Sequence, residues 1–216
     1  MNMALNLSKQ EEIVLNAVQD YLNKNRHFNL KKILPFIQSR FRRASININK
    51  YGIETILKSL VKKKLIVEGS KLTSNEILQN AKRVEIYDFI LKNPGTYFNK
   101  IITKLKISNH IVVWHLNMLE KFGYIKKEKI ENHNVYFDSE VAFNEVRIKY
   151  YLSNRKCEKI IGYLQINKIG INKTQLSTDL SMHINTVQKY LIILEKIGVI
   201  SKKKQSRTTL YFLNPI

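Results

Sequence analysis

The sequence is poor in the residues that build several common kinds of site. Its 216 residues include one cysteine, Cys157, which excludes a disulfide framework and any multi-cysteine metal site. Only seven glycines and three prolines are present, and no phosphate-binding glycine loop occurs. No apolar run approaches the roughly 18 residues that a membrane-spanning helix needs. We therefore expect a soluble, cytoplasmic protein without a cofactor or a membrane partner.

Acidic residues are also scarce relative to basic ones. The chain has 17 Asp and Glu against 37 Lys and Arg, a formal net charge of +20. An A+T-rich coding sequence would also favour Lys, Asn and Ile, but such codons encode Glu too, and the excess of Lys over Glu remains. A field of this sign attracts polyanions, of which nucleic acid is the commonest in a cell. Residues 1–80 and 155–216 each carry +8, whereas residues 81–140 carry +3. The two ends should therefore supply most non-specific attraction.

An internal repeat spans much of the chain. Residues 82–138 align without a gap on residues 157–213, at an offset of 75. The matched pairs include Leu105/Leu180, Val112/Val187, Leu116/Leu191, Leu119/Leu194, Gly95/Gly170, Gly123/Gly198 and Tyr136/Tyr211. Because the register persists through helices, a turn and a hairpin, the pattern indicates two copies of one module.

Each copy reads as three helices followed by a hairpin. In the first, "AKRVEIYDFILKN" places an apolar stripe at Val84, Ile86, Tyr87, Ile90 and Leu91, and "NKIITKLK" predicts a short second helix. Ser108 is expected to cap the third helix through its hydroxyl, and Gly123 to end it. Strands "YIKKEKI" and "VYFD" then flank a polar turn, "ENHN", and "VISKKK", "QSRT" and "LYFL" repeat the pattern. The predicted fold class is mainly α with small β-hairpins (α+β).

A helix–turn–helix whose third helix leads into such a hairpin is the winged-helix arrangement. The stretch "NPGTYFNKIITKLKISNHIVVWHLNMLEKFGYIKK", preceded by "AKRVEIYDFI", resembles the archaeal tandem winged-helix transcriptional regulators related to the MarR and ArsR groups. In that family a helix ends in "NPG", a serine caps the recognition helix and "HL…LE…G.I" closes it. The resemblance covers residues 74–213 and implies a role in transcription. ArsR relatives that sense metals carry clustered cysteines or His/Asp sets, which this sequence lacks, so no metal site is expected.

The first 73 residues repeat the pattern of three helices and a hairpin less closely. Ile53, Leu57 and Leu60 take the places of Val112, Leu116 and Leu119, and "KLIVEGSKLT" predicts a shorter wing. Lys64 stands where the other copies have glycine, and Pro35 is expected to bend or restart the second helix. We therefore predict three tandem winged helix-turn-helix modules, at residues 1–73, 74–140 and 155–216, with a connecting helix at 141–154. Whether the N-terminal module binds DNA stays open.

The outward face of each third helix is the candidate DNA-reading surface, because a helix–turn–helix sets the start of that helix in the major groove. Asn and Gln can pair with adenine, and Lys can reach a phosphate or a guanine. The alternative for any of these side chains is simple solvation. For Trp114 it is packing, and His115, beside the apolar face, is expected to be half-buried and hydrogen-bonded. The candidates are Asn109, His110, Val113, Trp114 and Asn117 in the middle module, and Ile184, Asn185, Thr186, Gln188 and Lys189 in the last.

The predicted hairpins carry a second indication of DNA binding. Basic residues on a wing typically contact phosphates or enter the minor groove, although a lysine run alone is usually a solvated face. The candidates are Lys126, Lys127 and Lys129 in the middle module, and Lys202, Lys203, Lys204 and Arg207 in the last.

These features predict a double-stranded DNA-binding protein of the nucleoid that regulates transcription and is not an enzyme. Two alternatives stay open. One is a nucleoid or chromatin protein that binds DNA without sequence preference. The other is a winged-helix protein–protein scaffold, which would expose apolar side chains on its third helices. The sequence leaves open the target sequence, an activating, repressing or architectural role, an inducer, and a homodimer or the transcription machinery as further partners.

Overall fold

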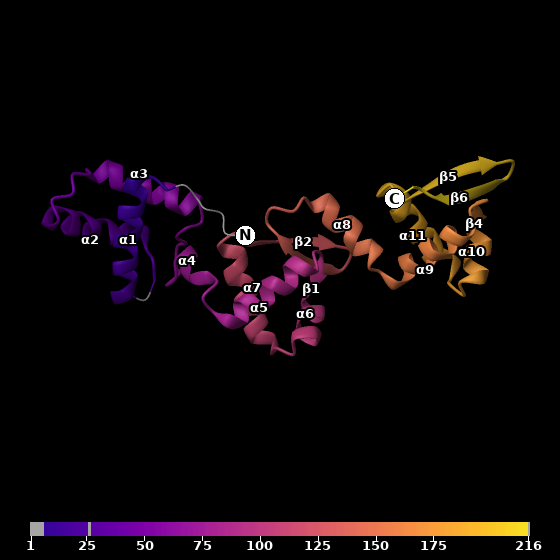
Figure 1. Cartoon of the computed structure of the whole chain (residues 1–216), viewed down its shortest axis with the longest axis horizontal. Helices are drawn as coiled ribbons and strands as arrows, with labels where there is room; N and C mark the ends of the chain where they lie inside the picture. The colour runs from indigo at the N-terminus through magenta and orange to yellow at the C-terminus, as the bar shows by residue number, and fades with distance from the viewer. Residues whose placement is uncertain (1–6, 26, 216) are drawn as a thin grey trace. The chain divides into compact units, whose positions relative to one another are not determined.

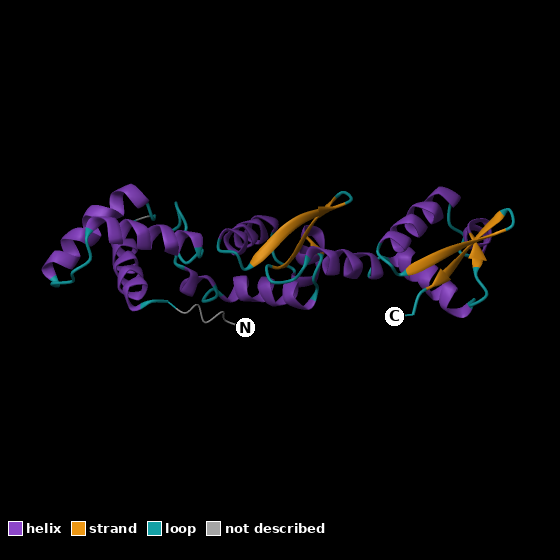
Figure 2. Ribbon diagram, turned by 90° about the horizontal axis from the view of Figure 1, so that it is seen from above, coloured by secondary structure: helices purple, strands orange, loops and turns teal. Residues whose placement is uncertain are grey.

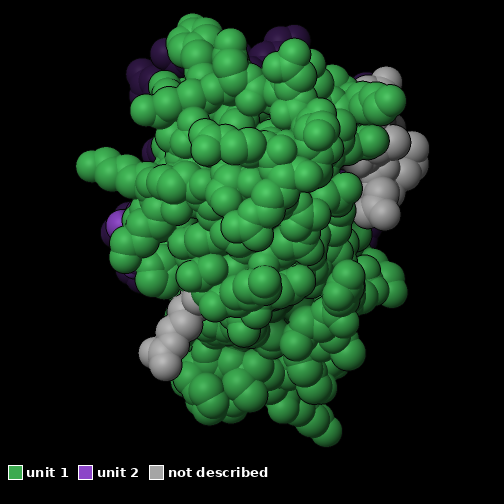
Figure 3. Space-filling view, turned by 90° about the vertical axis from the view of Figure 1, so that its left-hand side faces the viewer, with its two compact units in different colours: residues 1–92, 98–127 green, residues 93–97, 128–216 purple. Residues whose placement is uncertain are grey.

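The computed structural model describes residues 7–25 and 27–215, so residues 1–6 of the predicted N-terminal module lie outside the described part. Helices and two small antiparallel sheets make up the fold, which confirms the predicted α+β class (Figures 1 and 2). By packing, the chain divides into two compact units, coloured separately in Figure 3. Unit 1 comprises residues 1–92 and 98–127, and unit 2 comprises residues 93–97 and 128–216.

Unit 1 begins with three helices around one core, α1 (Lys9–Lys24), α2 (Leu30–Arg43) and α3 (Lys50–Lys62). Ser8 and Glu11 form a capping box that starts α1, and the Asn49 side chain accepts a hydrogen bond from the Gly52 N–H at 2.7 Å to start α3. The second helix does not restart at Pro35, because α2 runs through this residue as one helix. The core of these helices is fully buried and includes Val14, Val18, Ile33, Ile37, Ile53, Leu57 and Leu60.

The wing predicted at residues 64–73 is reduced to a single isolated bridge between Ile66 and Thr73. The loop bonds instead to Phe28, whose N–H donates to the Ser70 carbonyl at 2.7 Å and whose carbonyl accepts from the Gly69 N–H at 2.9 Å. Thr73 already begins the next helix, α4 (Ser74–Ile77), with its N–H bonded to the Glu76 carboxylate at 2.7 Å. Backbone groups that a longer hairpin would pair are therefore engaged elsewhere.

Unit 1 continues with α5 (Ala81–Lys92), α6 (Phe98–Leu105) and α7 (Asn109–Lys121). Of the predicted apolar stripe on α5, Ile86 and Ile90 are fully buried, but Leu91 is 39 % exposed and Arg83, which was not predicted, is 1 % exposed. Positions 83, 86 and 90 face the core, a spacing of three and four that one side of a helix presents. The other buried side chains here are Ile86, Ile90, Ile101, Val112, Leu116 and Leu119.

Two three-stranded sheets follow the same plan at an offset of 75 residues. The first has the order β1 (Thr96–Tyr97), β3 (His133–Asp138), β2 (Ile125–Ile130), and the second β4 (Ile171–Asn172), β6 (Thr208–Leu213), β5 (Ile200–Gln205). Two-stranded hairpins were predicted, so β1 and β4 are corrections. They form because Thr96 pairs with Tyr136 and Ile171 with Tyr211 directly after a glycine. The turns are also shorter than predicted, with two residues each, at 131–132 and 206–207.

Unit 2 holds one continuous core. It joins β3 to α8 (Phe143–Leu152), α9 (Arg155–Ile166), α10 (Lys173–Asp179) and α11 (Ile184–Lys196). Cys157 lies inside this core, and burial raises the pKa of its thiol to about 12.

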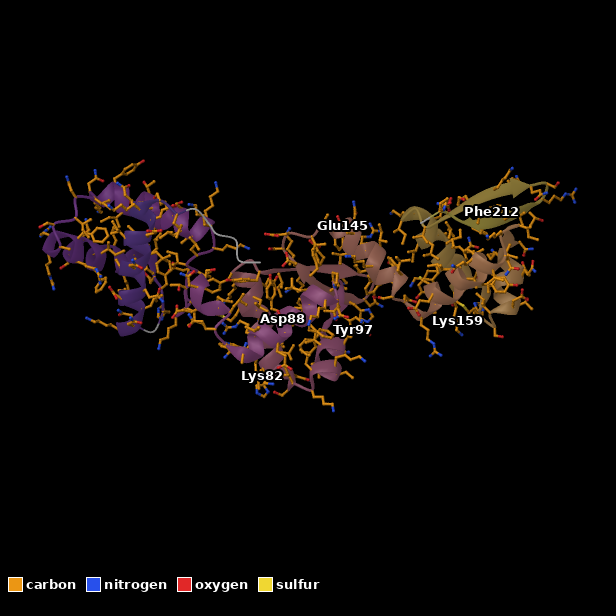
Figure 4. All side chains as sticks on the ribbon, viewed as in Figure 1. Lys82, Asp88, Tyr97, Glu145, Lys159 and Phe212 are labelled. Carbon is orange, nitrogen blue, oxygen red and sulfur yellow. The ribbon has the colours of Figure 1, made fainter. Side chains whose placement is uncertain are left out.

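Two features of the structure require glycine at position 170. Its φ of +87° is a backbone conformation that other residues rarely adopt, and a Cβ there would lie 2.4 Å from the ring of Phe212, labelled in Figure 4.

Left-handed residues recur at equivalent helix ends. The third helices are followed by Lys64, Gly123 and Gly198, with φ of 57°, 75° and 78°. The second helices are followed by Ser45, Lys106 and Ser181, with φ of 53°, 54° and 48°. Lys64 thus adopts the conformation that glycine adopts in the other two copies, at some cost in strain. The backbone makes the same turns three times, although residues 64–73, all of them described, form an isolated bridge where the later copies form a sheet.

Candidate nucleic-acid interface

The five residues singled out on α7 all lie on its solvent face. Asn109, His110 and Asn117 are exposed, and Val113 and Trp114 are 45 % and 51 % exposed. Ser108 precedes the helix in an extended conformation, but its hydroxyl makes no capping hydrogen bond to α7, contrary to expectation. At the equivalent position before α11, the His183 Nδ1 accepts from the Asn185 N–H at 3.2 Å.

Trp114 combines packing with exposure. The guanidinium of Arg83 lies 5.1 Å from its ring centre, and the His115 ring meets it edge-on at 4.8 Å. Arg83 is itself held by its Nη1, which donates to the Ile77 carbonyl at 2.6 Å. The cation–π contact fixes one side of the indole while half of its surface stays in solvent. The structure therefore leaves Trp114 available for contacts beyond its own unit.

His115 departs from expectation. It was predicted to be half-buried and hydrogen-bonded, but it is 3 % exposed and its Nδ1 has no hydrogen-bond partner among the described residues. Burial, and then the nearby charge of Arg83, lower the pKa of its imidazole below the ordinary value. Arg83, also buried beneath α7, has an Nε that likewise has no hydrogen-bond partner among the described residues.

On α11 some of the candidate residues already contact other side chains of the protein. Asn185, Gln188 and Lys189 are exposed, whereas Ile184 and Thr186 are half-buried. The Gln188 side-chain oxygen accepts a hydrogen bond from the Lys173 ammonium. The Lys189 Nζ lies 2.9 Å from Glu131 Oε1, and this bond raises the pKa of the ammonium. Two of the groups proposed to read DNA thus have partners within the protein.

The basic hairpin residues are exposed in both copies. Lys126, Lys127 and Lys129 lie on β2; Lys202, Lys203 and Lys204 lie on β5, and Arg207 lies in the two-residue turn. The β5–β6 hairpin extends outward from the helices of its unit (Figure 1). Since successive strand residues point to opposite sides, the lysines of β5 place positive charge on both faces of the hairpin.

Sequence reasoning missed an ion pair that occurs in both copies. Lys127 Nζ lies 3.2 Å from Glu120, and Lys202 Nζ lies 3.0 Å from Glu195, each pair 75 residues from the other. The signal was present in the alignment, where the last turns of the two helices share a Glu-Lys dipeptide. Exposed pairs of this kind contribute about 0–1 kcal/mol, so a phosphate can compete for either lysine.

A basic surface on the N-terminal helices was also missed. A cavity of about 420 Å³ at the end of α2 is lined by Lys24, Phe36, Ser39, Arg40, Arg43 and Ala44. Arg40 forms an ion pair with Asp20, and Tyr51, 78 % exposed, stands in the first turn of α3. The run "SRFRR" was the available signal for this surface.

Within the described part of the chain, no three His, Cys, Asp or Glu side chains gather as metal ligands would. The described helices include none with the length and apolar character needed to cross a bilayer.

Comparison with known proteins gives one informative match. No family model matches the sequence. A protein of Methanocaldococcus jannaschii named "Uncharacterized HTH-type transcriptional regulator MJ1398" is 29 % identical over 143 residues, which make up 66 % of this chain and 36 % of that protein. The chain therefore spans about a third of the relative's length. The match supports the resemblance to helix–turn–helix regulators that the sequence indicates.

Proposed function

We propose that the protein is a double-stranded DNA-binding regulator of transcription, built from three tandem winged helix-turn-helix modules. In this proposal α7 and α11 are recognition helices that each enter a major groove, and the basic hairpins lie on the phosphate backbone. The observation that carries the proposal is the arrangement in the last module. There a helix with exposed Asn185, Gln188 and Lys189 leads directly into a hairpin with exposed lysines.

The count of three modules is supported by the recurring backbone. Each of the three helix pairs ends in the same left-handed turns, and α3, α7 and α11 each have 13 residues. Only the later two have sheets, so we propose that the N-terminal module is a winged helix whose wing is almost lost.

The proposed roles follow from side-chain chemistry. Asn109, Asn117, Asn185 and Gln188 are suited to adenine, whose N6 and N7 offer the donor and acceptor that an amide matches. His110, Val113, Trp114 and Thr186 would contact base edges or sugars beside them. The wing lysines and Arg207 would neutralise phosphates, which fixes position without reading sequence.

The proposal includes no catalytic step, no metal and no cofactor, and it places the protein on the nucleoid in the cytoplasm. The name of the similar archaeal protein supports a regulator over a purely architectural protein. A homodimer and the transcription machinery are compatible further partners.

Competition binding tests the proposal. Sequences selected from random duplex DNA should bind at least about 10³-fold more tightly than bulk DNA, as specific regulators do. If six to ten phosphates are neutralised, affinity should also fall by about 10³–10⁵ between 50 and 200 mM salt. Equal affinity for all duplexes would contradict a regulator and favour the nucleoid protein.

The wing assignment has its own test. Reversing Lys202, Lys203, Lys204 and Arg207 to Glu should weaken binding and make the salt dependence shallower by about 0.9 for each phosphate that the hairpin no longer neutralises. The matched control reverses Arg155, Lys156, Lys159 and Lys168, which are also exposed in unit 2 and change the net charge equally. If both variants weaken binding to the same extent, the last hairpin has no special role.

One observation favours a second candidate for α7, the protein–protein scaffold. Its solvent face exposes Ile111, Val113 and Trp114 at 37 %, 45 % and 51 %, and apolar side chains of this kind are enriched in protein interfaces. Trp114→Ala separates the candidates. It should weaken DNA binding if α7 lies in a groove, and should leave DNA binding unchanged if α7 meets another protein.

A further inference from the structure

The tip of the middle hairpin reaches the outward face of α11. Glu131 is the first residue of the two-residue turn between β2 and β3 and has a φ of 52°. Its Oε1 lies 2.9 Å from the Nζ of Lys189, which stands on α11 between Gln188 and Tyr190. A carboxylate from one module thus lies on the surface proposed to read DNA in the next.

The core of unit 2 holds this tip in place. Ile130, next to Glu131, is 4 % exposed and belongs to the same buried cluster as Tyr151 on α8 and Val187 on α11. On the other side of the turn, His133 Nδ1 and the Tyr150 hydroxyl are 2.8 Å apart. Because side chains on both sides of Glu131 are anchored, its carboxylate is directed by packing rather than by the ion pair alone.

The carboxylate and a DNA phosphate would compete for the same ammonium. The side chain of Glu131 is 25 % exposed and that of Lys189 is 52 % exposed, so the pair is reachable from solvent. A pair this exposed contributes little to stability, so a phosphate can displace it. Until it is displaced, the carboxylate neutralises Lys189 and repels the DNA backbone.

We propose that Glu131 competes with DNA for Lys189, so that α11 binds DNA fully only when the hairpin tip releases this lysine. The inference rests on the proposed function and adds regulation to that site. It makes the middle hairpin a restraint on the last module, and any partner that draws residues 131–132 away from α11 would strengthen DNA binding.

The test is Glu131→Gln, which removes the charge and keeps the size of the side chain. Its matched control is Glu128→Gln, in the same hairpin, exposed, and outside the ion pairs formed by the described residues. We expect Glu131→Gln to bind duplex DNA about 1.5- to 5-fold more tightly than Glu128→Gln. Its salt dependence should be steeper by about 0.9, the value for the neutralisation of one further phosphate.

A double-mutant cycle localises the effect. Lys189→Gln should cost little affinity in the wild-type background and more in the Glu131→Gln background, because only there is the lysine free before binding. Additive effects would overturn the proposal, as would weaker binding by Glu131→Gln, which would mean that Glu131 orients Lys189 toward DNA.

A measurement without DNA separates this inference from the proposed function. The acylation rate of the Lys189 amine, followed by peptide mass spectrometry, should rise in Glu131→Gln and not in Glu128→Gln, since the bond to Glu131 raises the pKa of the ammonium. An unchanged rate means that the contact is absent in solution. A raised rate in a protein that binds no duplex means that the contact stands but the proposed function, and with it the competition, is wrong.

Discussion

At equivalent positions of α7 and α11, the buried aliphatic side chains match and several exposed side chains differ in kind. Val112, Leu116 and Leu119 correspond to Val187, Leu191 and Leu194, all at most 2 % exposed. On the solvent side Val113 becomes Gln188, Trp114 becomes Lys189, and Asn117 becomes Ile192. One backbone thus carries two surfaces, one with an aromatic and aliphatic centre and the other with an amide and a cation.

The difference follows the charge of the two regions. Residues 81–140 carry +3 and include Glu128 and Glu131 in their hairpin, whereas residues 155–216 carry +8. Within the proposed function, the last module supplies the stronger attraction to DNA, and the middle module supplies shape, apolar contact and the restraining carboxylate. The close-packed core positions are thus the same in the two helices, whereas the outer face, which packing does not constrain, differs.

The largest expected effect tests whether the two cores are equivalent. Leu116→Ala and Leu191→Ala should each destabilise the protein by about 2–5 kcal/mol, because each leaves a cavity at the same place in the module. Urea unfolding followed by circular dichroism measures the cost. The fluorescence of Trp114, the single tryptophan, reports on α7 specifically. If one substitution costs under about 1 kcal/mol, the two helices do not occupy equivalent cores.

A smaller effect is expected on the pH dependence of the free energy of unfolding. It arises from His115, whose equivalent in the last module is Tyr190. The pKa of His115 is lowered in the folded protein, so the unfolded chain takes up its proton at a higher pH than the folded chain does. Stability should therefore fall as the pH drops below the ordinary value of 6.5, by at most about 1.4 kcal/mol per pH unit.

His115→Tyr should flatten this dependence between pH 7 and pH 5. The measurement is the slope of unfolding free energy against pH, which does not depend on any constant cost of the substitution. His110→Tyr, an exposed position on the same helix, is the control. Equal slopes in both variants would show that His115 is not the group responsible.

The smallest effect extends the comparison to α3. Lys64 holds a φ of 57° where Gly123 and Gly198 stand in the later modules, so Lys64→Gly should stabilise the protein by up to about 1 kcal/mol. Gly198→Ala should destabilise it by a similar amount, since nothing lies within 4 Å of the added Cβ and only the conformation is strained. Thermal unfolding measures both, and the same sign for the two changes would contradict the shared turn.

Local patterns were sufficient to predict much of this fold. The helices, the glycine that ends α7 and the 75-residue register depend on side-chain period and on residues that permit special backbone angles, and both are written in the sequence. The two-residue strands β1 and β4 are too short to show a period. Arg83 was missed because a charged residue is assigned to the surface unless its partner is known.

The candidate site also has features that the sequence predicts and features that it does not. The outward placement of Asn109, Trp114 and Gln188 followed from helical period alone. Contacts between distant segments had no such signal, and the pairing of Glu131 with Lys189 required the packing of a hairpin, a connecting helix and α11 into one core.

The order of the strands has a consequence for solubility. β2 and β5 each lie at an edge of their sheet, where no other described strand pairs with their outer side. An exposed edge strand can pair with a strand of another copy, and closely spaced lysines oppose this pairing by mutual repulsion. The lysines proposed to bind DNA would therefore also prevent two free copies from pairing through their edge strands. Bound DNA would screen these charges and so weaken the repulsion between copies.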